Sequence, residues 1–181
     1  MKAVRNLIAA LAGAAIVSTP VLATGPSHPA SYLLNTVQQT GITVHTRCPE
    51  GVPFAGMYAS GNGMLAICAN GSSNTSTWTA DDRDTLRHEA IHLAQDCWGV
   101  IGDNDLETTR SILDVFQLMA LAHERTGLDF GRIEDEYRMR GADDMTILLE
   151  FEAWAGAAVL TDEQVAALVR KACINRDLNA S

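Results

Sequence analysis

The sequence predicts a single α+β domain in which a small antiparallel β-hairpin or sheet precedes a mainly helical body. Short strand-like runs separated by glycine-rich turns occupy residues 41–69, whereas helical apolar periodicity dominates from residue 79 onward. The sequence shows no internal repeat or linker, and its 181 residues suit one domain.

The start of the chain has the pattern of a secretory signal peptide. Lys2 and Arg5 precede an apolar run over residues 7–17, and Val21 and Ala23 stand at the −3 and −1 positions of a cleavage site. We therefore expect residues 1–23 to be removed and residues 24–181 to form the mature domain. The expected location is secreted or periplasmic, without stable membrane insertion after the signal is removed.

The charge balance excludes one large class of partners. The chain carries 13 Lys and Arg against 22 Asp and Glu, a net charge of −9. Removal of the signal takes Lys2 and Arg5 with it, which leaves 11 basic residues against 22 acidic ones and a net charge of −11. Such an acidic protein is not expected to bind nucleic acid.

The four cysteines predict two disulfides, since an even number in an exported chain is typical of oxidised pairs. They are Cys48, Cys68, Cys97 and Cys173. Three pairings are possible. We favour Cys48–Cys68, which flanks the predicted hairpin, and Cys97–Cys173, which would tie the central helix to the last one.

The first part of the chain alternates between a helix and short strands. Pro29 near a first turn predicts a helix over residues 27–39, and alternation of apolar and polar residues predicts a strand over 41–47. Residues 52–60 and 64–69 read as the strands of a hairpin around a Gly-Asn-Gly turn. The polar residues 71–77 predict a loop.

The second part is predicted to be helical throughout. A helix capped by Thr79 should end near Gly99, and a long one should run from about Asp105 to a terminator at Gly127. Further helices are predicted over residues 130–138 and 144–160, and a last one from a capping-box threonine at 161 to residue 173.

The central helix carries the sequence His88-Glu89-Ala-Ile-His92. Residues four apart lie on one face of a helix, with Cβ atoms about 5–6 Å apart, so both imidazoles can bind one metal ion. Glu89 would project beside that ion, where a carboxylate can accept a proton. The motif therefore predicts a metal site with Glu89 as a general base.

A catalytic zinc site needs a third protein ligand. The metzincin pattern fails, because Gln95 and Trp98 occupy the positions of its Gly and His. His28, His45 and His123 have no supporting spacing. The remaining candidates are three acids, listed here: Glu150, Glu152 and Glu107. Glu150 and Glu152 lie about 200° apart around one helix, so they cannot both serve.

Two short motifs resemble the gluzincins, which are zinc peptidases with the His-Glu-x-x-His helix and a glutamate on a downstream helix. The motifs are residues 88–92, followed by Asp96, and Glu150-Phe-Glu-Ala153. The resemblance implies a zincin-like fold and a Zn²⁺ ion held by His88, His92 and Glu150. It also implies a zinc-activated water, Glu89 as the general base, and a peptide or protein substrate.

One position departs from that family. Many gluzincins place Asp or Asn four residues after the ligand glutamate, as a partner for a ligand histidine, and this chain has Trp154 there. Asp96 or another acid would then supply the partner. Tyr137 is a candidate donor to the oxyanion, and one hairpin strand, over residues 55–60 or 64–69, is a candidate edge for an extended peptide.

Two other functions fit parts of the same pattern. The first is a non-catalytic, zinc-stabilised exported binding protein, in which Cys97 would be a fourth ligand if it were reduced. The second is a hydrolase that resembles peptide deformylase, with Cys48 or Cys68 as the third ligand. Gln95 stands where that family has Gly, and export disfavours it further. The sequence predicts neither the substrate's identity nor the oligomeric state.

Overall fold

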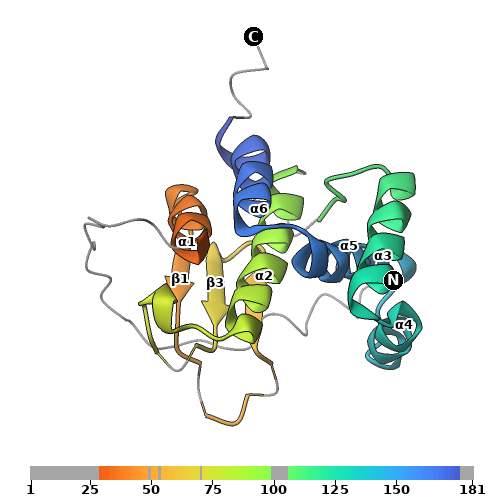
Figure 1. Ribbon diagram of the computed structural model, residues 1–181, viewed down its shortest axis with the longest axis horizontal. Coiled ribbons are helices and arrows are strands. Elements are labelled where there is room, and N and C mark those ends of the chain that lie inside the picture. The colour runs from red at the N-terminus through yellow and green to blue at the C-terminus, as the bar shows by residue number, and fades with distance from the viewer. Residues whose placement is uncertain (1–28, 49, 53, 70, 99–105, 176–181) are drawn as a thin grey trace.

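The computed structural model describes residues 29–48, 50–52, 54–69, 71–98 and 106–175, which form an α+β fold (Figure 1). Its elements in chain order are α1 (Pro29–Gln39), β1 (Thr43–His45), β2 (Gly56–Ala59), β3 (Met64–Ile67), η2 (Thr75–Thr77), α2 (Ala80–Trp98), α3 (Ile112–Thr126), α4 (Phe130–Met139), α5 (Asp144–Val159), α6 (Asp162–Val169) and η3 (Arg170–Ile174). The predicted fold class, strands first and helices after, is therefore confirmed in outline.

The sheet is mixed rather than wholly antiparallel, with the strand order β1-β3-β2. The predicted hairpin exists, because β2 and β3 pair antiparallel with Tyr58 opposite Leu65. The expectation of an antiparallel sheet is wrong for β1, which pairs parallel to β3 with Val44 opposite Leu65. β2 runs opposite to both β1 and β3, and β1 joins the hairpin on the β3 side rather than the β2 side, so its pairing is parallel.

Both favoured disulfides are present, Cys48–Cys68 and Cys97–Cys173. The parallel pairing explains the first one, since Cys48 follows β1 and Cys68 follows β3, and parallel strands end at the same edge of a sheet. The second joins the last turn of α2 to η3. Two disulfides fit an oxidising compartment.

The helix-capping and helix-terminating residues predicted from the sequence lie at the ends of the observed helices. Thr79 Oγ1 accepts from the Asp82 N–H at 3.1 Å, and Thr79 N–H donates to Asp82 Oδ2 at 2.8 Å, so this pair caps α2. Thr161 and Gln164 form the capping box of α6. Gly127 ends α3 in the left-handed conformation, with φ at 73°.

The start of α3 corrects the sequence prediction. Asp105 lies outside the described residues, but residues 106–111 are not helical, and the helix begins at Ile112 with Ser111 as its cap. The physical reason is tertiary: Thr109 gives its N–H and hydroxyl to the buried carboxylate of Glu152 rather than to a helix. Local periodicity cannot reveal such a contact.

The remaining differences are small. β1 is shorter than predicted, the loop over residues 71–77 contains the 3₁₀ turn η2, and α6 continues into the π-helical turn η3. The predicted start of the first helix at residue 27 and the stop at Gly99 lie outside the described residues.

Buried apolar side chains form two clusters on either side of the α2–α5 contact. The sheet-side cluster consists of Leu33, Leu34, Val37, Tyr58, Leu65, Ile67, Ala69, Trp78, Leu86, Ala90, Ile91, Leu93, Ala94, Cys97, Ala153, Val165, Ala166, Val169 and Ala172. The α3–α5 cluster consists of Val115, Ile133, Ile147 and Phe151. Figure 1 shows the sheet, α1 and α6 around α2, with α3 and α4 beyond α5.

None of the helices in the described part of the chain is long and apolar enough to cross a membrane.

Candidate metal centre

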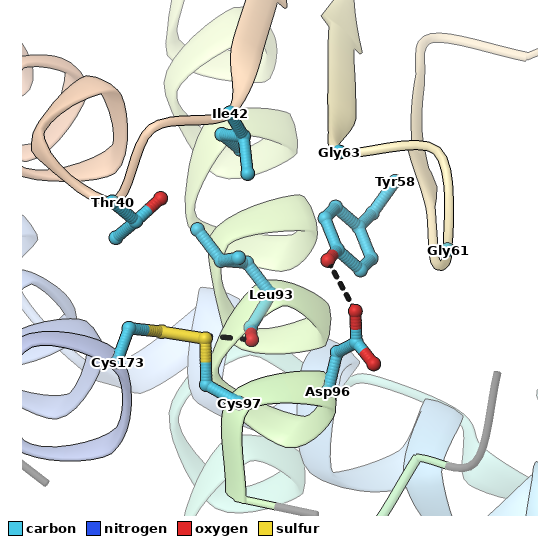
Figure 2. Close-up of a pocket in the computed structure, with 9 residues that line it drawn as sticks. All are labelled: Thr40, Ile42, Tyr58, Gly61, Gly63, Leu93, Asp96, Cys97 and Cys173. Atoms are coloured by element: carbon cyan, nitrogen blue, oxygen red, sulfur yellow. Dashed lines mark hydrogen bonds between the residues drawn. A yellow bond between two sulfur atoms is a disulfide. The ribbon is translucent and has the colours of Figure 1, made fainter. Parts of the chain in front are cut away.

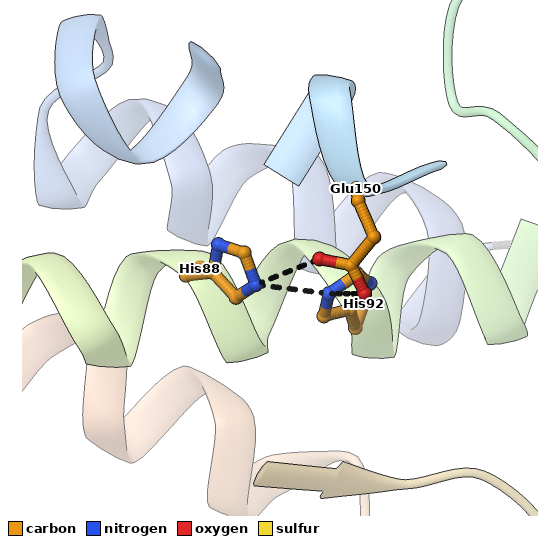
Figure 3. Close-up of side chains that lie close together, drawn as sticks. All are labelled: His88, His92 and Glu150. Carbon is orange, nitrogen blue, oxygen red and sulfur yellow. Dashed lines mark hydrogen bonds and ion pairs between the residues drawn. The ribbon is translucent and has the colours of Figure 1, made fainter. Parts of the chain in front are cut away.

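Three side chains chosen from the sequence converge between α2 and α5 (Figure 3). His88 and His92 lie one turn apart on α2, and their Nε2 atoms are 3.1 Å apart. Glu150 enters from α5, with Oε2 at 3.4 Å from His88 Nε2 and Oε1 at 3.5 Å from His92 Nε2. All three side chains are 15% exposed or less.

The spacing of these atoms fits a tetrahedral ion. Ligands bound to zinc at about 2.0–2.1 Å in tetrahedral geometry are separated by about 3.3 Å. The three observed separations of 3.1–3.5 Å are close to that value, although the two histidines contact different oxygens of Glu150. Two imidazoles with one carboxylate form a donor set that zinc accepts, so the group could hold a metal ion.

Close packing of α5 on α2 brings Glu150 to the histidines. Gly156 on α5 allows the approach, since a Cβ at this position would lie 2.5 Å from Ile91 Cδ1 of α2. Ala153 of α5 is fully buried in the same contact. The small residues of α5 thus determine how near Glu150 comes to α2.

Glu89 lies beside the three-residue group and is buried, at 7% exposed. Burial raises its pKa, an effect that the adjacent histidines and the N–H of Tyr58 in β2 only partly offset. Gly56 lets β2 come close, because a Cβ there would meet Thr85 Cγ2 at 2.3 Å and Glu89 Cγ at 3.0 Å. A buried carboxylate with a raised pKa is suited to accept a proton near neutral pH.

The charges of the group depend on one another. Burial alone would lower the pKa of His92, but the charge and hydrogen bond of Glu150, together with Glu89 and Gln95, raise it to about 9. Burial alone would raise the pKa of Glu150, but His92 and His88 hold it well below its usual range. The two pKa shifts thus have one common cause, the attraction between His92 and Glu150.

Two aromatic residues complete the surroundings. The pKa of Tyr137 is raised by burial and then by the charge and hydrogen bond of Glu150, so its hydroxyl stays protonated beside the group. Trp154 packs edge-on against His88, with ring centroids 4.8 Å apart, and is 39% exposed. The position where gluzincins have Asp or Asn thus supplies an aromatic contact.

The competing acids lie elsewhere. Glu152 is fully buried on another side of α5, where it bonds to Gln95, Thr109 and Arg110. Glu107 is exposed and lies outside the group. Of the three candidate third ligands, only Glu150 joins the two histidines among the described residues.

The sulfur-ligand alternatives do not fit this structure. Cys97 is bonded to Cys173, so it cannot be the fourth ligand of a closed zinc site. Cys48 and Cys68 are bonded to each other, which removes the cysteine that a deformylase-like site requires.

Sequence reasoning missed the partner of His92, which is Gln95. The His92 Nδ1 lies 2.8 Å from Gln95 Oε1. Asp96, which with other acids is a predicted partner for a ligand histidine, accepts a hydrogen bond from the Tyr58 hydroxyl at 2.5 Å. The local signal for Gln95 is its spacing, since residues three apart share a helix face. The burial of Gln95, which makes partners necessary, is visible only in the structure.

A small cavity lies on a different side of α2, between the hairpin and η3 (Figure 2). Tyr58 and Asp96 line it with their hydrogen bond, and the Cys97–Cys173 disulfide lines it opposite them. None of the three converging residues takes part in it.

Comparison with known proteins gives no further identification: neither a family model, nor a curated protein, nor a solved structure matches this chain.

Proposed function

We propose that the protein is an exported zinc-dependent metallopeptidase. The observation that carries this proposal is the convergence of His88, His92 and Glu150, whose nitrogen and oxygen atoms lie 3.1–3.5 Å apart, next to the buried Glu89. The two disulfides support a secreted or periplasmic location. The resemblance to gluzincins rests on the same residues.

Each residue has a role in this proposal. His88, His92 and Glu150 hold the ion, and zinc bound there would supply Lewis acidity, which polarises a carbonyl and lowers the pKa of water. Glu89 accepts a proton from the attacking water and passes it to the leaving amine. Tyr137 is hydrogen-bonded to Glu150, and its raised pKa, which keeps the hydroxyl protonated, supports the role of a donor to the oxyanion.

The edge of the sheet supports a peptide as the substrate. β3 is the central strand, so the predicted edge over residues 64–69 is already paired on both sides, whereas β2 is one of the two edge strands. Successive residues of a strand point their N–H groups to opposite edges of the strand. The Tyr58 N–H points away from β3 and is hydrogen-bonded to Glu89. The unpaired edge of β2 therefore runs beside the general base, where an extended peptide can lie.

In an alternative function the protein binds the metal ion but does not catalyse a reaction. The ligands come from α2 and α5, so one ion would join the elements that carry the two hydrophobic clusters. This favours a zinc-stabilised exported binding protein as the alternative.

Metal analysis on the purified mature protein tests the site. We expect one zinc per chain by elemental analysis, with two imidazoles and a carboxylate by X-ray absorption, and much weaker binding in Glu150→Ala. A folded wild-type protein that binds no metal would refute the proposal, and wild-type binding in Glu150→Ala would refute the third ligand.

A peptide-library screen separates the enzyme from the binding protein. Glu89→Gln should retain zinc and lose cleavage about 100-fold or more, because general bases contribute about 10²–10⁴-fold. Glu124→Gln, which removes an exposed acid far along the chain, is the matched control. Zinc binding without cleavage by wild type would favour the zinc-stabilised binding protein.

A further inference from the structure

We propose that Gln95 and Glu152 are positioning residues of the metal centre. In this proposal Glu152, which is held by Thr109 and Arg110, orients the Gln95 amide. Gln95 in turn holds the His92 ring with Nδ1 protonated, so that Nε2 points at the other two ligands. The inference rests on the proposed metal site but concerns residues outside the ligand set.

The direction of the Gln95 amide follows from its other partners. Gln95 Nε2 donates to the Leu149 carbonyl at 3.0 Å and to Glu152 Oε2 at 3.0 Å. Both partners are acceptors, since a backbone carbonyl oxygen such as that of Leu149 cannot donate. The NH₂ group of Gln95 must therefore face these two oxygens. The amide oxygen is then the atom that faces His92 Nδ1.

The amide oxygen in turn determines the state of His92. A carbonyl oxygen only accepts, so the contact of 2.8 Å requires a hydrogen on His92 Nδ1. In the neutral ring the lone pair is then on Nε2, which lies 3.1 Å from His88 Nε2 and 3.5 Å from Glu150 Oε1. Gln95 thus selects the tautomer that can bind an ion at this position.

Glu152 is itself held firmly. Its side chain is fully buried and receives the Thr109 N–H at 3.0 Å, the Thr109 hydroxyl at 2.5 Å and Arg110 Nη1 at 3.0 Å. A buried carboxylate is costly unless it is paired and hydrogen-bonded, so this set of donors accounts for its position. α5 therefore contributes Glu150 to the ligand group and Glu152 to the orientation of His92.

The two histidines differ in this respect, which provides an internal comparison. His88 Nδ1 is buried and makes no hydrogen bond within the described part of the chain. Its ring packs against Trp154 instead. Loss of Gln95 should therefore alter His92 and leave His88 unchanged.

The test uses the full mature protein and zinc alone as the ligand. In Gln95→Leu we expect zinc affinity, measured by competition with a chromophoric chelator, to fall about 10- to 100-fold. Thr109→Val, which removes one donor from Glu152 but keeps its N–H, should reduce affinity by a smaller factor. Trp154→Phe, which alters the contact to His88, is the control for the spectroscopic signal of His92.

Nitrogen-15 NMR of the histidine rings provides a signal that a change in overall stability alone would not alter. The wild type should show a His92 Nδ1–H protected from solvent exchange, with or without zinc, and this signal should be lost in Gln95→Leu and kept in Trp154→Phe. Absence of the protected proton in wild type, or wild-type zinc affinity in a folded Gln95→Leu or Thr109→Val, would overturn the inference. Failure of the wild type to bind zinc would instead refute the metal site, while the protected proton still tests the role of Gln95.

Discussion

The two hydrophobic clusters are stabilised in different ways. The sheet-side cluster lies within a region that both disulfides cross, and it draws on α1, the sheet, α2 and α6. The α3–α5 cluster has four buried members and, in the described part of the chain, no disulfide. Helix α3 also leaves Ile112, Leu113 and Phe116 half-exposed or more.

Because no disulfide crosses the α3–α5 cluster in the described part of the chain, the α2–α5 contact must hold this cluster to the rest of the molecule. Helices α3 and α4 reach the rest of the molecule mainly through α5. The polar contacts between α2 and α5 include the candidate ligands, the Gln95–Glu152 pair and the hydrogen bond from Arg87 Nε to the Ala157 carbonyl. We infer that the candidate ligands and the Gln95–Glu152 pair help to hold the two hydrophobic clusters together, in addition to the roles proposed for them above.

The largest effect should come from removing the disulfide that closes the longer loop. Its cysteines are 76 residues apart, and the chain-entropy relation then gives a loss of about 4 kcal/mol in the free energy of unfolding for the pair of Cys97→Ser and Cys173→Ser. The Cys48–Cys68 pair, 20 residues apart, should cost about 3 kcal/mol. Urea unfolding measures both, and the reverse order would contradict the entropic explanation.

Phe151→Ala tests whether the clusters open separately. Phe151 is 9% exposed and packs edge-on against Phe130, so its truncation should cost about 3 kcal/mol. Hydrogen exchange should show faster opening of α3 and α4 than of the sheet. Leu33→Ala in the sheet-side cluster is the control, and equal acceleration throughout the chain in both variants would show that the clusters unfold as one unit.

Tyr58→Phe should cost about 2 kcal/mol, because it removes a buried hydrogen bond to Asp96. Burial and then Asp96 raise the pKa of Tyr58 above the unfolded value of about 10. Its contribution is therefore full below that unfolded pKa and is lost as pH rises toward the folded one. Ultraviolet titration should show its phenolate only upon alkaline unfolding. A Tyr58 signal before unfolding, or an equal cost in the half-exposed Tyr32→Phe, would contradict this.

The smallest effect concerns the α2–α5 contact itself. Gly156→Ala gains about 0.5–1 kcal/mol of helix propensity but forces Cβ against Ile91 Cδ1, so we expect a net loss of about 1 kcal/mol. Ile91→Val removes that atom and should rescue the variant in a double-mutant cycle. Additive effects of the two substitutions would mean that the contact adjusts without strain.

Sequence reasoning succeeded where the determinants are local. Thr79 and Thr161 cap helices through residues three positions away, and Gly127 ends α3 through its own backbone conformation. The grouping of His88 with His92 follows from helix geometry, and the structure brings Glu150 to them. That these residues bind zinc stays a prediction.

It failed where the determinants are distant in sequence. The start of α3 depends on Thr109 binding Glu152, and the role of Gln95 depends on the same glutamate. Whether β1 pairs parallel with β3 or antiparallel with β2 depends on which edge of the hairpin it joins, and the alternation of Val44 with its neighbours does not encode this. In each case a partner from another element decides the outcome.

Glu150 and Glu152 share one helix, and this limits how the site can change over evolutionary time. Each residue inserted into a helix rotates everything beyond it by about 100°. A substitution at either position alters one contact, whereas an insertion or deletion between Asp143 and Glu150 would turn both acids away from His92 and Gln95 together. Among descendants of this sequence that keep the site, we therefore expect α5 to vary in its side chains but not in its length before Glu152.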